Sequence, residues 1–123
     1  MQQPTVLLVD DERDFVDTMS IRLQANGYRV IGAYSGEKGL EIAQRGNIDV
    51  ILLDILMPGM SGFEVLEKLG ADERTRRIPV VVLSSAGETK FIFKAERLGA
   101  KDYVIKTADS SEMLEALDRV LPR

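Results

Sequence analysis

The chain contains no cysteine and no histidine. Without cysteine it has no disulfide, no thiolate metal site and no thiol nucleophile, which is compatible with the cytoplasm. Without histidine it has no Ser-His-Asp triad, no histidine metal ligand and no phosphohistidine of its own. Any histidine that takes part in phosphate chemistry with this chain must therefore belong to a partner.

Long apolar runs are also missing. No apolar stretch approaches the ~20 residues that a membrane-spanning helix needs, and the first residues lack the basic and apolar regions of a signal peptide. The net charge of −4 argues against nucleic-acid binding by the surface as a whole. We therefore expect a cytoplasmic protein without direct membrane or nucleic-acid contacts.

Short apolar runs alternate with amphipathic stretches along all 123 residues. The apolar runs predict strands and the amphipathic stretches predict helices. The predicted strands are 5–9, 28–33, 49–53, 79–84 and 102–105, and the predicted helices are about 12–26, 36–45, 61–70, 88–98 and 110–121. Five such units in a row predict an α/β domain with a parallel sheet and helices on both faces. No linker interrupts the pattern, so residues 1–123 are expected to form one domain.

Residues at the predicted helix ends agree with these boundaries. Ser61 with Glu64, and Asp109 with Glu112, have the spacing of capping boxes that open a helix. A left-handed cap at the end of a helix favours glycine, which has no Cβ. Four glycines follow the predicted helices: Gly27, Gly46, Gly70 and Gly99.

Polar side chains stand where four of the apolar runs end. In chain order they are Asp10 and Asp11, then Asp54, then Ser84 and Ser85, and finally Lys106. Because ligands of parallel α/β sheets bind outside the carboxyl ends of the strands, these side chains are expected to share one crevice. Clustered carboxylates repel one another, and a hard cation such as Mg²⁺ relieves that repulsion. Taken singly, each residue also has an ordinary use at a helix start, in a turn or as a solvated lysine.

With these residues in this order and spacing, the chain resembles the receiver domain of bacterial two-component response regulators. The matching pieces are Asp10-Asp11, the segment 54–62, the Ser85-Ala86 step and the segment Tyr103-Val104-Ile105-Lys106. The resemblance covers essentially the whole chain. It implies a flavodoxin-like (βα)5 fold with strand order 2-1-3-4-5.

The resemblance also implies a phosphorelay function. Asp54 is expected to accept a phosphoryl group from a histidine kinase or a histidine phosphotransfer protein, and the phosphorylated form would act on a downstream effector protein. The cofactor would be Mg²⁺. Its expected ligands are Asp10, Asp11, Asp54 and the backbone carbonyl of Leu56.

Three further residues take roles from the resemblance. Ser85 is expected to be the switch hydroxyl, Lys106 the lysine that pairs with the phosphate, and Tyr103 the aromatic switch. The family usually has a cis proline directly after the lysine, whereas this chain has Thr107. A cis peptide before a residue other than proline costs ~3–4 kcal/mol, so we predict a trans Lys106–Thr107 peptide.

The fourth predicted helix carries three consecutive apolar residues, which one helix cannot all bury against one sheet. We therefore expect a partner surface over the fourth helix, fifth strand and fifth helix, which also offers a route to a homodimer. The alternative is that one of these three side chains is simply half-buried and contacts no partner. The expected contact residues are Phe91, Ile92, Phe93 and Lys94.

Two other functions fit parts of the pattern. A phosphatase of the haloacid dehalogenase type also uses Asp, Mg²⁺, Ser or Thr and Lys at strand ends, but it expects its nucleophile in an Asp-x-Asp pattern on the first strand. Here that strand is followed by Asp10-Asp11-Glu12. The second alternative is a receiver-like docking module that is never phosphorylated, for which the Thr107 departure leaves room.

Overall fold

The computed structural model describes residues 3–85, 89–107 and 109–121. Five strands form one parallel sheet in the order β2-β1-β3-β4-β5. They are β1 (Thr5–Val9), β2 (Arg29–Ala33), β3 (Val50–Asp54), β4 (Val80–Ser84) and β5 (Asp102–Ile105). The predicted α/β class and strand order are confirmed, and each strand lies within a residue of its predicted run or inside it.

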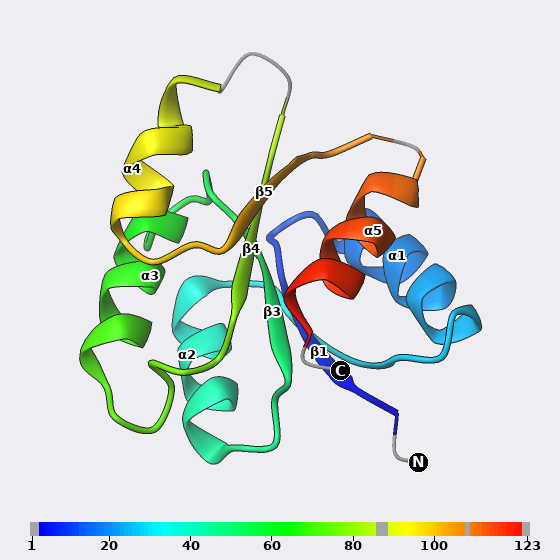
Figure 1. The fold of residues 1–123 in the computed structure, drawn as a ribbon, viewed down its shortest axis with the longest axis horizontal. Helices are drawn as coiled ribbons and strands as arrows, with labels where there is room; N and C mark the ends of the chain where they lie inside the picture. Colours follow the sequence, from blue (N-terminus) through cyan, green and yellow to red (C-terminus); the bar gives the residue numbers. More distant parts are fainter. Residues whose placement is uncertain (1–2, 86–88, 108, 122–123) are drawn as a thin grey trace.

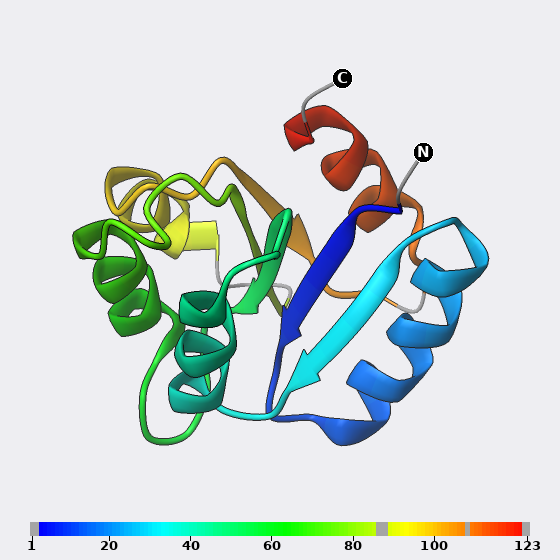
Figure 2. The same cartoon turned by 90° about the horizontal axis from the view of Figure 1, so that it is seen from below.

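Helices cover both faces of this sheet (Figures 1 and 2). Helices α1 and α5 pack on one face, and α2, α3 and α4 lie on the other. Their bounds are α1 (Arg13–Ala25), α2 (Gly36–Arg45), α3 (Gly62–Ala71), the 3-10 turn η1 (Thr89–Phe91) with α4 (Ile92–Arg97), and α5 (Ser111–Val120).

Side-chain alternation along the strands supplies both cores. In β1, Val6 and Leu8 pack toward α1 and α5, whereas Leu7 and Val9 pack toward the opposite helices. Every residue of the central strands β3 and β4 is buried, while the edge strand β2 buries only Ala33. A near-continuous apolar run is typical of a strand that is covered on both faces, which agrees with the apolar sequences of the central strands.

The predicted capping boxes have different outcomes. Ser61 caps α3: its hydroxyl accepts from the backbone N–H of Glu64, whose carboxylate accepts from the backbone N–H of Ser61. The Asp109 and Glu112 box is wrong. Helix α5 begins one residue later than that box requires, and Asp109 instead accepts hydrogen bonds from Ser111 in a local turn.

Three of the four glycines have the left-handed backbone expected after a helix. The φ angles are +92° at Gly27, +92° at Gly46 and +104° at Gly99. The prediction for Gly70 is wrong, because α3 continues through Gly70 to Ala71. The helix ends at the C-cap residue Asp72, whose carboxylate accepts a hydrogen bond from the backbone N–H of Arg74.

Two other expectations concern peptide geometry and helix length. The described residues contain no cis peptide, so the Lys106–Thr107 bond is trans as predicted. Within the same described part of the chain, no helix has both the length and the apolar character needed to cross a bilayer.

Candidate metal and phosphoryl site

Three carboxylates meet at the carboxyl ends of β1 and β3. Asp10 and Asp11 follow β1, and Asp54 is the last residue of β3, which pairs with β1. One oxygen from each of the three carboxylates lies within 4.8 Å of the other two. The structure therefore brings together the three acids that the sequence placed in one crevice.

The turn after β3 fixes the backbone of this crevice. The N–H of Ile55 donates to the carbonyl of Leu83, and the N–H of Gly62 donates back to the carbonyl of Ile55 at 2.8 Å. A Cβ at Gly62 would lie 2.5 Å from the carbonyl oxygen of Asp54, so only glycine fits there without moving the backbone. The start of α3 is thus packed directly against the residue that ends β3.

Burial raises the pKa values of two of these acids. Asp54 is only 6% exposed, and burial, reinforced by the nearby charge of Asp10, raises its pKa to about 7. The pKa of Asp10 is also raised by burial, although Lys106 and the backbone N–H of Glu12 favour its charged form. The repulsion that the sequence predicted is therefore present.

Asp10 also has an incompletely satisfied oxygen. Its Oδ1 accepts a hydrogen bond of 2.9 Å from the N–H of Glu12. Its buried Oδ2 lies 2.8 Å from the ammonium of Lys106 but accepts no hydrogen bond of good geometry. Hard oxygen donors that are close together, partly unsatisfied and mutually repelling fit a divalent cation such as Mg²⁺.

Lys106 reaches the crevice from the end of β5. Its backbone N–H donates to the carbonyl of Ser84 at 2.7 Å, and its ammonium lies between Asp10 and Glu12 and over the ring of Phe15. Burial lowers the pKa of Lys106, but the close contacts of its ammonium with the carboxylates of Asp10 and Glu12 outweigh burial and raise the pKa overall. The lysine therefore stays charged beside the acids.

The two serines after Leu83 lie in different environments. Ser84 is fully buried, and its hydroxyl contacts both the hydroxyl of Tyr103 and the carbonyl of Ser85. Ser85 is exposed. Ser84 therefore contacts the aromatic residue Tyr103 through its hydroxyl, whereas the switch hydroxyl predicted from the sequence is that of Ser85.

The predicted partner surface has one exposed aromatic residue. Phe93 is 76% exposed, while Phe91 and Ile92 are half-buried. The Phe91 ring meets Phe63 of α3 edge to face, with the ring centroids 5.3 Å apart. As expected, the helical segment formed by η1 and α4 does not bury all three of its consecutive apolar side chains.

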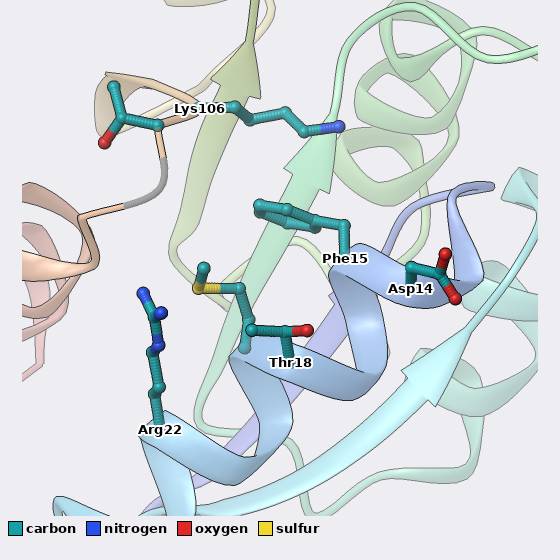
Figure 3. Close-up of a pocket in the computed structure, with 7 residues that line it drawn as sticks. Asp14, Phe15, Thr18, Arg22 and Lys106 are labelled. Atoms are coloured by element: carbon teal, nitrogen blue, oxygen red, sulfur yellow. The ribbon is translucent and has the colours of Figure 1, made fainter.

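Sequence reasoning did not single out Glu12 or Phe15, both of which contact the Lys106 ammonium. Beside them lies a pocket of about 430 Å³ between α1 and the segment after β5 (Figure 3). Its lining residues are Asp14, Phe15, Thr18, Met19, Arg22, Lys106 and Thr107. A glutamate at a helix N-cap was the one available signal, because shorter side chains are preferred at that position.

The fold and the crevice together define a flavodoxin-like domain with an acidic ligand site at the carboxyl edge of its sheet. Residues 6–118 match the family described as the response regulator receiver domain, and the chain belongs to that family. Receiver domains of response regulators in two-component systems bind Mg²⁺ through acidic residues, are phosphorylated by histidine kinases and act on effector domains.

Individual relatives agree with this placement. The chain is 38% identical over 120 residues to the DNA-binding dual master transcriptional regulator RpaA of Synechocystis. The matched region covers 98% of this chain but only 50% of RpaA. The chemotaxis response regulator CheY4 of Vibrio cholerae has a TM-score of 0.90, at 30% identity, covering 98% of this chain and 100% of CheY4. The response regulator TrrA of Thermotoga maritima, solved with Mg²⁺ and BeF, has a TM-score of 0.85 at 29% identity, covering 96% and 99% of the two chains.

Proposed function

We propose that this chain is the phosphoacceptor of a two-component phosphorelay and that Asp54 carries the phosphoryl group. The observation that carries this proposal is the convergence of Asp10, Asp11 and Asp54 beside Lys106. Three acids in one crevice are a poor arrangement for stability alone, because each raises the free energy of the others' charged form. They are well suited to a site that works with a bound cation.

The proposed reaction transfers a phosphoryl group between two nucleophiles. A carboxylate oxygen of Asp54 attacks the phosphorus, the bond from phosphorus to the partner's histidine nitrogen breaks, and that nitrogen keeps the electron pair. Later, water attacks the same phosphorus, its bond to Asp54 breaks, and inorganic phosphate leaves. Lys106 neutralises charge on the phosphoryl oxygens and positions them, which is the main requirement for such transfers.

The proposed metal ligands are Asp10, Asp11 and Asp54, with the backbone carbonyl of Leu56 as the fourth group. The bound cation would neutralise the acids and screen the phosphoryl oxygens from the attacking carboxylate. The unsatisfied Oδ2 of Asp10 supports this assignment. The backbone N–H of Leu56 lies against the Asp54 carboxylate and favours its charged form, so Leu56 already contributes to the crevice through its main chain.

We propose that a serine hydroxyl and Tyr103 report the phosphorylated state to the surface. Ser84 supports this role best because its hydroxyl contacts that of Tyr103, and a shift of one group would move the other. Ser85 remains the second candidate. Ser84→Ala and Ser85→Ala variants are compared for phosphoryl lifetime and for the part of the tyrosine fluorescence that Tyr103→Phe removes. The switch residue is the one whose loss uncouples the change in that fluorescence from phosphorylation.

The proposed partners are a histidine kinase or histidine phosphotransfer protein in the cytoplasm, followed by an effector protein. The proposed effector surface is the face formed by α4, β5 and α5, which also offers a route to a homodimer. The exposed ring of Phe93 supports this surface, with Phe91, Ile92 and Lys94 beside it in sequence. The ammonium of Lys94 lies 4.2 Å from the centroid of the Phe63 ring, which ties this face to α3.

Mass spectrometry after incubation with acetyl phosphate and Mg²⁺ tests the proposal. We expect a stoichiometric, labile adduct on Asp54 that EDTA prevents and that Asp54→Asn abolishes. An intact protein that never forms the adduct would instead support the docking module. Sustained turnover of small phosphate esters would support the phosphatase alternative.

A further inference from the structure

The side chain of Glu12 does not cap the helix at whose N-terminus it lies. Glu12 is the N-cap residue of α1, where Ser, Thr, Asp or Asn normally accepts a hydrogen bond from the first turn. Its side chain makes no such bond. Its Oε1 instead lies 2.5 Å from the ammonium of Lys106, which is 94 residues further along the chain. The carboxylate is therefore directed at the lysine and not at the helix.

Three groups hold the Lys106 ammonium on the α1 side of the crevice. They are Oδ2 of Asp10 at 2.8 Å, Oε1 of Glu12, and the ring of Phe15, whose centroid is 4.4 Å away. Figure 3 shows the lysine extended above the Phe15 ring. Within the described part of the chain, no hydrogen bond or ion pair joins Lys106 to Asp54, whose charge acts on the lysine only through space.

The two carboxylates differ in how readily they can release the lysine. Asp10 is fully buried, so its charge would be stabilised neither by a protein partner nor by water if Lys106 left it. The Glu12 side chain is 64% exposed and can be hydrated as soon as the ion pair opens. The pocket beside Phe15, Thr18 and Thr107 leaves open space on the same side of the lysine chain. Glu12 is thus the contact that can break.

We propose that Glu12 is a positioning residue that retains Lys106 toward α1 in the unphosphorylated protein and competes with the phosphoryl group for it. This inference rests on the proposed phosphorylation of Asp54. Accepting the phosphoryl group then includes the exchange of one ion pair for another. The strength of the Glu12 contact sets how readily Lys106 reaches the new oxygens.

The experiment compares Glu12→Gln with wild type for binding of beryllofluoride at saturating Mg²⁺ and for the rate of labelling by acetyl phosphate. Gln keeps the size of the side chain and removes the competing charge. Because an exposed ion pair is weak, we expect binding to tighten and labelling to accelerate by about two- to fivefold. The backbone N–H of residue 12 still donates to Asp10, so the metal site itself is kept.

Two further variants separate the contact from its charge. Asp14→Asn removes one negative charge from the first turn of α1, and its carboxylate points away from Lys106 in Figure 3, so it should behave as wild type. Glu12→Asp keeps the charge but shortens the reach, and it should behave as Glu12→Gln. If Glu12→Asp matches wild type, or if Asp14→Asn matches Glu12→Gln, the charge acts only at long range and the inference is overturned.

The failure of this inference is distinguishable from failure of the proposed function. If every variant labels at the wild-type rate, Asp54 is still a phosphoacceptor and only the role of Glu12 is lost. If neither wild type nor any variant is labelled or binds beryllofluoride, the proposed function fails and takes this inference with it. A purely structural role would instead shift the denaturation midpoint of Glu12→Gln relative to Asp14→Asn and leave both rates unchanged.

Discussion

An ion pair lies at each end of β5, one at the amino edge of the sheet and one at its carboxyl edge. The two pairs have nearly the same length but different surroundings. Where β5 begins, Arg119 of α5 lies 2.7 Å from Asp102. Where β5 ends, Lys106 lies 2.8 Å from Asp10. The Arg119 side chain is 58% exposed, whereas that of Lys106 is 11% exposed. Water screens the first pair and protein surrounds the second.

This difference decides what each pair contributes. An exposed pair gains little from its attraction because both charges were already well solvated. A buried pair is strongly interdependent, since removing one partner leaves the other without protein or water to stabilise it. The carboxyl edge therefore concentrates charge that is unfavourable for folding but suited to the proposed cation and phosphoryl group, while the opposite edge bears ordinary surface charge.

Removing the lysine should break this comparison most strongly. We expect Lys106→Met to lower the free energy of unfolding by about 3–5 kcal/mol in EDTA, because Asp10 loses its buried partner beside two further acids. Urea denaturation at neutral pH measures this. Saturating Mg²⁺ should recover part of the loss, since the cation replaces the missing positive charge. A loss as small as that of Arg119→Met would contradict the assigned role of burial.

The pKa of Asp54 predicts how the metal-free protein responds to pH. The folded state holds a proton on Asp54 up to about pH 7, whereas the unfolded chain releases it near the ordinary value of 3.8. Stability in EDTA should therefore fall as pH rises between these values, by about 2–4 kcal/mol from this group. Asp54→Asn should remove that part of the slope and be more stable than wild type above pH 7. Parallel pH profiles for the two proteins would contradict this cause.

The two ends of α3 allow the same comparison through backbone packing. Gly62→Ala should destabilise by about 2–3 kcal/mol, because its Cβ would meet the backbone of Asp54 and Ile55, which cannot yield cheaply. Gly70→Ala is the matched control: a Cβ there meets nothing within 4 Å, and alanine should stabilise the helix by about 0.5–1 kcal/mol. Thermal unfolding of both variants tests this. A stabilising Gly62→Ala would show that the crevice backbone is not tightly packed.

The sequence predicts the fold and the acidic crevice for the same reason. Apolar runs that are long enough to be buried on both faces mark the strands, and residues that end parallel strands meet at one edge. Asp10, Asp11 and Asp54 could therefore be brought together from sequence positions alone. No knowledge of side-chain conformation is needed, because alternation sets the face to which each strand residue points and the register sets which residues are its neighbours.

The remaining details depend on contacts that have no periodicity. Alternation indicates that only one of Ser84 and Ser85 points into the crevice, but the side chain that meets Tyr103 depends on how the strand end turns. Glu12 reaches a lysine that is distant in sequence through a flexible side chain, so no spacing rule predicts the contact. The start of α5 likewise depends on a local contact: the Asp109 carboxylate accepts a hydrogen bond from the backbone N–H of Ser111, and this bond competes with the capping box.

The smallest effect is expected for the exposed pair at the beginning of β5. Arg119→Met should change the free energy of unfolding by less than about 1 kcal/mol, and high salt should reduce that difference further. A double-mutant cycle with Asp102→Asn isolates the pair from the other contacts of each side chain. If the cycle gave a coupling as large as the loss in Lys106→Met, two ion pairs of equal length would have equal strength despite unequal burial. Solvent exposure would then no longer explain why the proposed reactive site lies in the acidic crevice and not at the opposite edge of this sheet.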